Sequence, residues 1–399
     1  MPSRRRFIKL NMATMAFLTG CIQEESSFPP NTPMSNVSNP NECQNDPQAS
    51  GCDTTAVSLD VKIGQMLLVG FRGFTVNQSA PIVQDIQDRQ IGGVILFDYD
   101  VAQKRRARNI QSPAQVKALV KTLQDYSKTP LLVAIDYEGG KVNRLREQFG
   151  FPGTFSHQDF GEKNEPAFTY KEASKMAQTL AKLGINLNFA PVVDVNTNPD
   201  NPIIGKIKRS FSANPDIVTK QAIEFIKAHR RQKILCSPKH FPGHGSSVAD
   251  SHLGLADVSE TWDPLELEPY KKMIQAGEVD AIMTAHVFNR KLDPNDPATL
   301  SKPTVTGLLR DELGFDGIVF SDDMQMKAIA SHYGLEAAVR KVIEAGVDIL
   351  VIGNNMGNFV PDIAERVFAI IKGLVQNGII SEQRIEESYQ RILRMKQRL

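Results

Sequence analysis

Residues 239–252, with the sequence KHFPGHGSSVADSH, hold three histidines, a lysine and an aspartate within fourteen positions. They follow an apolar run at 234–236 with strand character, and their glycines and proline disfavour helix, so we expect a loop at a strand end. Asp250 and His252 are two residues apart. If the loop folds back, the carboxylate orients and polarises the imidazole, which can then act as a general acid/base in a hydrolytic site. A metal-binding or solvated histidine-rich loop is the alternative.

A second group of chemically capable residues follows another apolar run. Residues 317–320 have the pattern of a buried strand and lead directly into 321–324, SDDM. A carboxylate at the end of a strand can serve as a covalent nucleophile. Because side chains alternate along a strand, Asp322 and Asp323 are not expected to face the same side.

The elements that must position these residues recur along the chain. Short apolar runs of strand type lie at 66–69, 93–97, 131–135, 187–190, 234–236, 281–283, 318–320 and 349–352. Segments with helical periodicity lie between them, including 113–126, 170–183, 215–230 and 335–345. A last helix is expected to begin after Ser381, an N-cap residue, and to pack through Ile385, Tyr389, Ile392 and Leu393.

Eight strand–helix units in alternation predict an α/β fold, a (β/α)₈ TIM barrel that forms one catalytic domain over residues 58–399. This span exceeds the roughly 250 residues typical of the fold, which leaves room for long loops. An open doubly wound sheet is the alternative. We favour the barrel because polar motifs follow the third to seventh strands, and one rim of a barrel collects them all.

The two motifs, with the intervening D-S-H at 250–252, resemble the β-N-acetylglucosaminidases of glycoside hydrolase family 3. Three further segments fit the resemblance in the same order: AIDYEGGKVNRL at 134–145, LNFAPVVDVN at 187–196 and MTAHV at 283–287. The resemblance extends from roughly Leu59 to the C-terminus and implies the barrel fold together with a carbohydrate substrate.

The resemblance also implies which residues hold the terminal sugar. Asp136 and Arg144 are expected to bind its hydroxyls, since a carboxylate beside a guanidinium suits that task. Lys239 and His240 are expected to do the same from the signature loop. Arg209, in the segment RSF, is expected to meet the substrate, although the three residues at 206–208 make its approach longer than is usual in the family.

For the reaction, the resemblance implies a retaining double displacement without metal or cofactor. Asp322 is the expected nucleophile and Asp323 a structural neighbour. His252, oriented by Asp250, is expected to protonate the leaving oxygen and later to deprotonate water. The expected substrates carry terminal β-linked N-acetylglucosamine, as peptidoglycan fragments and chitin oligosaccharides do.

Three alternatives stay open. An exo-β-glucosidase or β-xylosidase of the same family is one, although the related β-glucosidases take a glutamate acid/base from a second domain, and we expect a single catalytic domain here. An N-acetylglucosaminide phosphorylase is another, because a histidine acid/base tolerates phosphate as the acceptor better than a carboxylate would. A catalytically silent sugar-binding lipoprotein is the third.

The composition is that of an ordinary soluble protein, with 41% hydrophobic and 23% charged residues and a formal net charge of +1. No basic excess points to nucleic acid, so we expect no nucleic-acid partner, and we expect a monomer. The charge run from Lys104 to Arg108 is interpreted as solvated surface.

The N-terminus predicts export. Residues 3–9, SRRRFIK, match the twin-arginine pattern, and an apolar stretch at 10–18 follows. Residues 18–21, LTGC, have the form of a lipobox, so residues 1–20 are expected to be a signal peptide and Cys21 to carry the lipid that anchors the protein in the bacterial envelope. An ordinary secretory signal with a chance cysteine is the alternative.

Residues 21–57 are rich in Pro, Asn, Ser, Gln and Asp and predict a flexible tether. Within it, Cys43 and Cys52 are expected either to pair across their short loop or to remain free thiols. Cys236, on a predicted strand, is expected to be a small buried apolar residue.

Overall fold

Eight short parallel strands lie where the apolar runs predict them, and every residue in them is buried. The computed structural model describes residues 57–251 and 254–399. The strands are β1 (Leu67–Gly70), β2 (Gly93–Leu96), β3 (Leu132–Ile135), β6 (Leu187–Asn188), β7 (Leu235–Cys236), β9 (Ala281–Met283), β11 (Ile318–Phe320) and β12 (Leu350–Ile352). The predicted signal peptide, nearly all of the tether, Cys21, Cys43, Cys52 and His252 lie outside the described residues.

The strands close into a barrel. Six of them are hydrogen-bonded in the order β12-β1-β2-β3-β6-β7, and β9 pairs with β11. Two parallel bridges complete the circle: Phe241 with Thr284 between the ends of β7 and β9, and Phe320 with Ile349 between β11 and β12. The barrel is therefore the fold, as predicted, and the open-sheet alternative is excluded.

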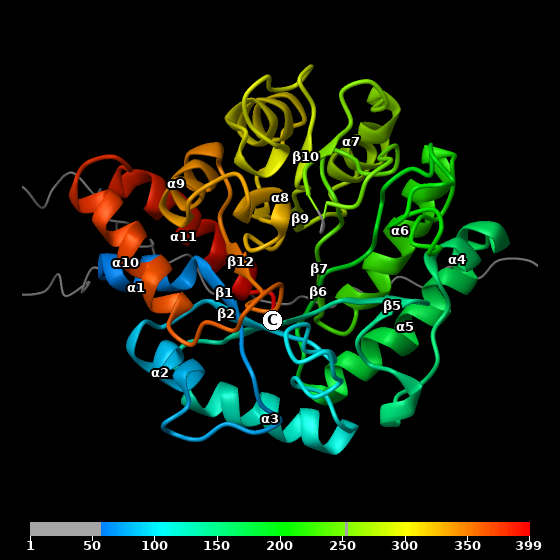
Figure 1. Ribbon diagram of the computed structural model, residues 1–399. Coiled ribbons are helices and arrows are strands. Elements are labelled where there is room, and N and C mark those ends of the chain that lie inside the picture. Colours follow the sequence, from blue (N-terminus) through cyan, green and yellow to red (C-terminus); the bar gives the residue numbers. More distant parts are fainter. Residues whose placement is uncertain (1–56, 252–253) are drawn as a thin grey trace, which may run out of the picture. The chain divides into compact units, whose positions relative to one another are not determined.

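Helices surround the strands as an outer ring (Figure 1). They are α1 (Leu59–Gln65), α2 (Pro81–Asp88), α3 (Pro113–Tyr126), α5 (Pro166–Leu183), α6 (Pro215–Arg230), α7 (Glu268–Gln275), the π-helical η5 (Pro303–Glu312), α9 (Leu335–Ala345), α10 (Ile363–Gln376) and α11 (Glu382–Lys396). The predicted bounds of α3, α6 and α9 are confirmed. Helix α5 begins four residues earlier than predicted, because Pro166 is accommodated in its first turn.

Helix α11 begins as predicted. The Ser381 hydroxyl accepts a hydrogen bond from the backbone N–H of Arg384. Ile385, Tyr389 and Ile392 are buried, whereas Leu393 is only half-buried. Met395, two residues on, is buried, so the packed stripe of the helix includes a position that the sequence interpretation left out.

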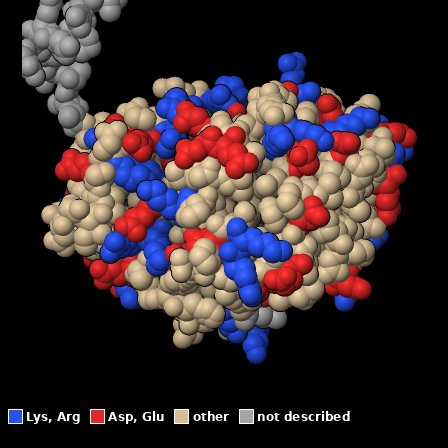
Figure 2. Space-filling model, turned by 90° about the horizontal axis from the view of Figure 1, so that it is seen from above, with Lys and Arg blue, Asp and Glu red and all other residues tan. Residues whose placement is uncertain are grey.

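None of the described helices is both long and apolar enough to cross a membrane. Lys and Arg side chains are intermixed with Asp and Glu on the face shown in Figure 2. This mixture agrees with the near-zero net charge of the sequence.

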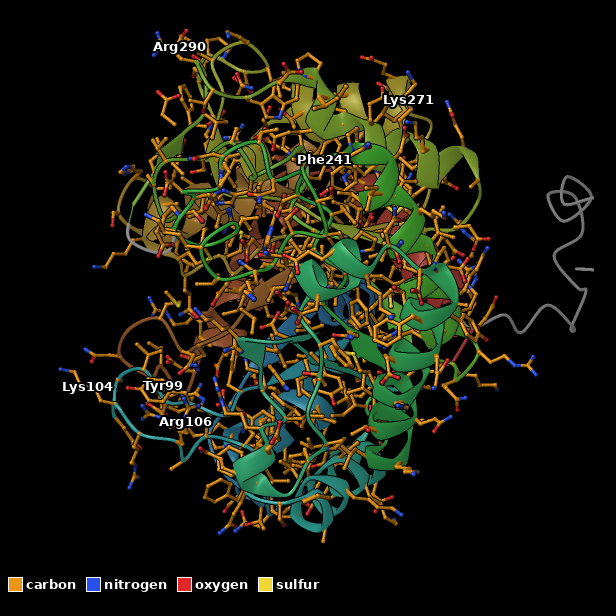
Figure 3. The ribbon with its side chains drawn as sticks, turned by 90° about the vertical axis from the view of Figure 1, so that its right-hand side faces the viewer. Tyr99, Lys104, Arg106, Phe241, Lys271 and Arg290 are labelled. Atoms are coloured by element: carbon orange, nitrogen blue, oxygen red, sulfur yellow. The ribbon has the colours of Figure 1, made fainter. Side chains whose placement is uncertain are left out.

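The segments that leave the C-terminal ends of the strands are long and contain small elements of their own. They include β4 (Tyr137–Gly139), β5 (Val142–Asn143), η2 (Glu147–Phe149), α4 (His157–Lys163), β8 (Ala256–Asp257), η3 (Pro264–Leu267), β10 (Val287–Phe288), η4 (Ala298–Leu300) and α8 (Lys327–Ala330). The segment after β2, with Tyr99, Lys104 and Arg106, extends along one edge of the domain (Figure 3).

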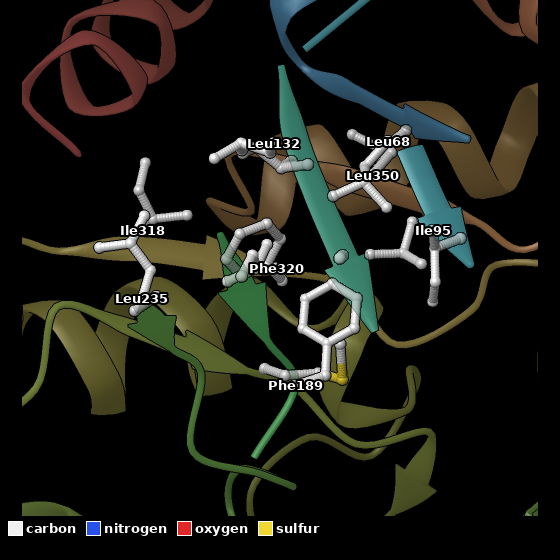
Figure 4. Packing of buried hydrophobic residues seen from close by; sticks show 14 of the residues in the cluster. Leu68, Ile95, Leu132, Phe189, Leu235, Ile318, Phe320 and Leu350 are labelled. Atoms are coloured by element: carbon white, nitrogen blue, oxygen red, sulfur yellow. The ribbon is translucent and has the colours of Figure 1, made fainter. Parts of the chain in front are cut away.

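Large apolar side chains fill the interior of the barrel (Figure 4). Phe189, just after β6, meets Phe320 of β11 edge-to-face, with ring centroids 5.3 Å apart. Both side chains are at most 1% exposed. The barrel is therefore a packed core rather than a pore, so a ligand can be held only at its rim.

Candidate active site

The C-terminal rim of the barrel surrounds a cavity of about 420 Å³. Its polar lining comes from segments that follow different strands: Asp136, Glu138 and Arg144 after β3, Arg209 after β6, Lys239, His240 and Asp250 after β7, and Asp322 and Asp323 after β11. The structure therefore gathers in one cavity every predicted site residue that it describes in the catalytic domain.

An ion-pair network forms one wall of the cavity. The Lys239 ammonium lies 2.7 Å from Asp136 Oδ1 and 2.8 Å from Glu138 Oε1. The Arg209 guanidinium donates two hydrogen bonds of 2.8 Å to the Glu138 carboxylate, and Arg144 donates to Asp136 Oδ2 at 3.1 Å. Two carboxylates and three cations thus alternate across the wall.

This network keeps its members charged. Burial alone would raise the pKa of Asp136, but Lys239 and Arg144 lower it to about 2. In the same way, Arg209 and Lys239 hold the pKa of Glu138 well below its usual range. Asp136 and Glu138 in turn raise the pKa of Lys239 against the effect of burial. At neutral pH the wall therefore offers fixed ionic donors and acceptors, which suit the hydroxyls of a sugar.

The turn between β4 and β5 returns Arg144 to Asp136. Gly139 and Gly140 have φ values of +95° and +57°, in the left-handed region that favours glycine. A Cβ on Gly139 would lie 2.0 Å from the carbonyl oxygen of Phe155, so that position excludes any side chain. The backbone N–H of Arg144 donates to the Asp136 carbonyl oxygen at 3.3 Å, which places both side chains at the cavity.

Arg209 reaches the cavity despite the longer segment before it. Its backbone N–H donates to the Ile204 carbonyl oxygen at 3.0 Å, and Ile203 and Ile207 line the cavity on either side of this turn. Arg209 and Glu138 are both buried, and breaking a buried pair of this kind typically costs about 3–5 kcal/mol. Arg209 therefore supports the wall as well as lining it, with Glu138 as its structural partner.

Asp194 positions the signature loop. Its carboxylate lies 2.7 Å from His240 Nδ1 and accepts hydrogen bonds from the backbone N–H groups of His240 and His244 at 3.1 and 2.9 Å. It is fully buried and does not line the cavity. Asp194 is therefore a buried partner of the loop rather than a contact for the ligand. The Lys239–His240 and Phe241–Pro242 peptide bonds are both cis.

Glu266 also supports this loop, and the sequence interpretation missed it. Its Oε2 accepts a hydrogen bond of 2.8 Å from the backbone N–H of Gly245, and burial raises the pKa of Glu266 to about 7. It lies within the short 3₁₀ helix η3, outside every motif, so no local pattern distinguishes it. His244 is also buried, with its Nε2 3.0 Å from the Ser251 hydroxyl.

The two adjacent aspartates after β11 differ in their contacts. Asp323 Oδ1 accepts hydrogen bonds from the backbone N–H groups of Gln325 and Gly353 at 3.1 and 3.0 Å, as a strand-end cap would. His286 Nε2 lies 2.9 Å from the Asp323 carbonyl oxygen. Asp322 Oδ1 accepts from the Asp323 backbone N–H at 2.8 Å. Both carboxylates border the cavity, so the choice of Asp322 as nucleophile stays a prediction.

Asp250 lies at the cavity wall, on the loop that leads to His252. Because His252 lies outside the described residues, the predicted dyad of Asp250 and His252 stays a prediction. Within residues 57–251 and 254–399, no three His, Cys, Asp or Glu side chains are grouped so that they could hold a metal ion.

Several lining residues could not be recognised in the sequence. Tyr99 and Val101 come from the segment after β2, and Asn355 and Met356 from the segment after β12. The only feature of the sequence that could have indicated their place in the cavity is that they follow predicted strands. They face the cavity because β1 pairs with both β2 and β12, so the segments that follow β2 and β12 meet at the rim.

Fold and site together define a (β/α)₈ barrel protein whose rim cavity suits a polyhydroxylated ligand. The sequence profile of the family described as glycosyl hydrolase family 3 N terminal domain matches residues 58–395. The chain therefore belongs to this family, and the resemblance that its motifs indicated is confirmed at that level.

Two relatives that match most of the catalytic domain are both named beta-hexosaminidase. Beta-hexosaminidase A of Pseudoalteromonas piscicida is 34% identical in an alignment 374 residues long that covers 84% of this chain and 60% of that protein. A beta-hexosaminidase of Tolumonas auensis is 37% identical in an alignment 283 residues long that covers 68% of this chain and 80% of that protein.

Solved structures agree with the barrel. A glycoside hydrolase family 3 beta-N-acetylglucosaminidase from Paenibacillus sp. str. FPU-7 superimposes with a TM-score of 0.78 at 35% identity, over 86% of this chain and 63% of that one. A beta-N-acetylhexosaminidase from Beutenbergia cavernae superimposes with a TM-score of 0.75 at 29% identity, over 86% of this chain and 99% of that one. This chain thus spans about 60% of the Pseudoalteromonas and Paenibacillus relatives and nearly all of the Beutenbergia one.

Proposed function

We propose that the protein is a retaining exo-β-N-acetylglucosaminidase. One observation carries this proposal: a single rim cavity holds Asp322 together with the ionic wall formed by Asp136, Glu138, Lys239 and Arg209. The wall suits the hydroxyls of one terminal sugar, and the carboxylate supplies a nucleophile. The names of the relatives support N-acetylglucosamine as that sugar.

In the first step Asp322 attacks the anomeric carbon. A bond forms between a carboxylate oxygen and that carbon while the bond to the leaving oxygen breaks, and the leaving oxygen takes a proton from His252. In the second step His252 removes a proton from water, whose oxygen displaces the carboxylate from the same carbon. Two inversions restore the β configuration. Asp250 orients the imidazole and stabilises its charged form.

Burial supports the exo mode. Lys239, His240 and Arg209 are each less than 10% exposed, which favours a chain end over an internal unit as the sugar that they hold. Peptidoglycan fragments and chitin oligosaccharides both present such an end.

The test compares two aryl glycosides that differ only at C2, 4-nitrophenyl N-acetyl-β-glucosaminide and 4-nitrophenyl β-glucoside. We expect kcat/KM to favour the first by about 100-fold or more, because a site shaped to an acetamido group leaves its partners unpaired with a hydroxyl. Equal rates, or a preference for the glucoside, would support the glucosidase alternative. Release of the 1-phosphate in phosphate buffer would instead identify a phosphorylase.

We further propose that the mature protein is held in the cell envelope by a lipid on Cys21. The twin-arginine pattern and the lipobox of residues 1–21 support this proposal. Cys21→Ser should move the protein from the membrane fraction to the soluble fraction of the producing cells, and [³H]palmitate should label only the unchanged protein. A wild-type protein found soluble in the cytosol would contradict the signal interpretation.

A further inference from the structure

Residues 242–246 of the signature loop, which we call the loop stem, are anchored through their backbone. Trp262 Nε1 donates a hydrogen bond to the Pro242 carbonyl oxygen at 3.1 Å. Glu266 Oε2 accepts a hydrogen bond from the Gly245 N–H at 2.8 Å. Both anchoring side chains come from one short segment, at and just before η3. Because the anchors hold backbone atoms, they do not depend on the side chains of the stem.

Glu266 contacts the stem so closely that two stem positions have no room for a side chain. Gly243 has a φ value of +124°, and a Cβ there would lie 2.6 Å from Glu266 Cβ and 2.7 Å from Glu266 Oε2. A Cβ on Gly245 would lie 1.7 Å from the Val195 carbonyl oxygen and 3.3 Å from Glu266 Oε2. The stem backbone therefore has no free space beside Glu266, and a shift of the Glu266 carboxyl group must shift the stem.

Local hydrogen bonds continue from the stem towards Asp250. The Ser247 hydroxyl donates to the Ala249 carbonyl oxygen at 2.7 Å and accepts from the Ala249 N–H at 3.2 Å. The Asn198 side chain donates to the Ser247 carbonyl oxygen at 3.0 Å. Asp250 then lines the cavity, whereas Glu266 does not. An effect of Glu266 on the reaction must therefore pass through the loop.

The surroundings of Glu266 favour an un-ionised acid. Its side chain is fully buried, and its Oε1 has no hydrogen-bond partner among the residues that the structure describes. The hydroxyl of Tyr270, buried on α7, has none among the same residues. Burial raises the pKa of Glu266 to about 7, and the negative charge of Asp194 acts in the same direction, while hydrogen bonds from the loop stem act against them.

The other titratable groups around Glu266 keep their charge state near neutral pH. Burial alone would raise the pKa of Asp194, but His240 lowers it, so Asp194 stays ionised. Burial lowers the pKa of His244 to about 4 and raises the pKa of Tyr270 well above its usual range. Among Asp194, His244, Tyr270 and Glu266, only Glu266 therefore changes its charge near pH 7.

We propose that Glu266 is a positioning residue that sets, through the loop stem, where the signature loop presents Asp250 to the cavity. It holds the stem as an un-ionised acid. Ionisation places a second carboxylate charge beside Asp194 in a buried site, and the repulsion displaces the carboxyl group together with the stem. The inference rests on the proposed glycosidase function and adds to it a residue outside the cavity that controls proton transfer to the leaving group.

The first test is Glu266→Ala, assayed with poor and good leaving groups. We expect kcat/KM for N,N′-diacetylchitobiose, whose leaving oxygen needs a proton, to fall about 10- to 100-fold, since a misplacement of about 1 Å can cost on the order of 100-fold. The 2,4-dinitrophenyl glycoside departs without a proton and should lose much less. The affinity for N-acetylglucosamine should stay unchanged, because the ionic wall is anchored elsewhere. A role in folding alone would lower both rates equally.

The second test is Glu266→Gln, whose amide oxygen can still accept from the Gly245 N–H but never ionises. With chitobiose, kcat/KM of this variant should match wild type at about pH 6 and exceed it by up to about tenfold at about pH 8, where most of the wild-type Glu266 is ionised. The ionisation of His252 contributes to both profiles, so the difference between them reports Glu266. Glu268→Gln makes the same change at a half-buried residue that pairs with Lys272, and its profile should follow wild type.

Thermal unfolding provides a readout that does not depend on activity. The pKa of Glu266 rises from its ordinary value of 4.5 to about 7 on folding, so the folded protein holds a proton that the unfolded chain has released between these values. This contribution to stability is complete below about pH 4.5 and is lost as the pH rises through about 7. The Tm of wild type relative to Glu266→Gln should therefore fall between about pH 5 and about pH 8.

The outcomes separate this inference from the proposed function. Equal losses with both leaving groups in Glu266→Ala, or identical pH profiles of wild type and Glu266→Gln, would overturn the positioning role and leave the glycosidase function standing. A Tm difference that does not change with pH would mean that Glu266 is ionised throughout and would also overturn the inference. If Glu266→Ala does not fold, the comparison of wild type, Glu266→Gln and Glu268→Gln decides. If wild type cleaves neither substrate, the proposed function fails and the inference fails with it.

Discussion

Asp322→Ala is expected to lower kcat about 10⁴-fold or more while leaving the affinity for the product N-acetylglucosamine nearly unchanged. The nucleophile forms its bond during the reaction, so its loss raises the barrier more than it weakens ground-state binding. The ionic wall that holds the sugar is anchored elsewhere, through Glu138 and Lys239. Turnover of 4-nitrophenyl N-acetyl-β-glucosaminide and titration with N-acetylglucosamine measure the two effects.

Asp323→Ala is the matched control for this prediction. It removes the hydrogen bonds to the backbone of Gln325 and Gly353, so stability should fall and activity should fall less than in Asp322→Ala. Azide should restore turnover in Asp322→Ala and give an α-glycosyl azide, because it enters from the face that the carboxylate leaves open. Near wild-type turnover of Asp322→Ala with an inactive Asp323→Ala would mean that the other aspartate is the nucleophile.

His252→Ala is expected to slow the first step by about 10²- to 10⁴-fold for natural disaccharides, because their leaving oxygens need a proton. Activated aryl glycosides leave without that help, so their first step should change much less. Asp250→Asn should show the same dependence on the leaving group in milder form, because it removes the charge that supports the imidazolium. Measuring kcat/KM for a series of aryl leaving groups gives the slope that reports proton donation.

His244→Ala is the control within the same loop. Its ring contacts Ser251 rather than the cavity, so losses with good and poor leaving groups should be equal. Azide should speed the second step of His252→Ala and give a β-glycosyl azide, since azide needs no general base. An equal loss for all leaving groups in His252→Ala would assign that residue to the loop architecture, and an α-configured hydrolysis product would exclude double displacement.

The pattern of neighbouring residues was sufficient to predict the strands and helices of the barrel. The apolar runs that became β3, β9 and β11 are bounded by polar, glycine or proline residues. Helix α3 begins at Pro113 after the Ser112 cap, which is a signal carried by adjacent residues. The alternation of strand and helix was enough to predict closure. Closure in turn predicted that residues following different strands would share one rim, as Asp136, Lys239 and Asp322 do.

The partners of these residues could not be predicted in the same way. Asp194 and His240 are 46 positions apart, Glu138 and Arg209 are 71 apart, and Asn355 meets Val101 across 254 positions. No periodicity or spacing relates such pairs, because they meet only after the strands have closed and the long rim segments have folded over one another.

The sequence by itself therefore determined the strands, the helices, the barrel and the identity of the residues able to do chemistry. Each of those depends on propensities and apolar spacing within a few neighbouring residues. Only the tertiary structure decided which charges neutralise one another and which remain in excess. Asp98 is shared by Arg106 and Arg146 and Asp100 by Arg72 and Arg108, whereas Arg144 lies nearer to Asp136. Each of these pairings depends on which side chains burial brings within ion-pair distance.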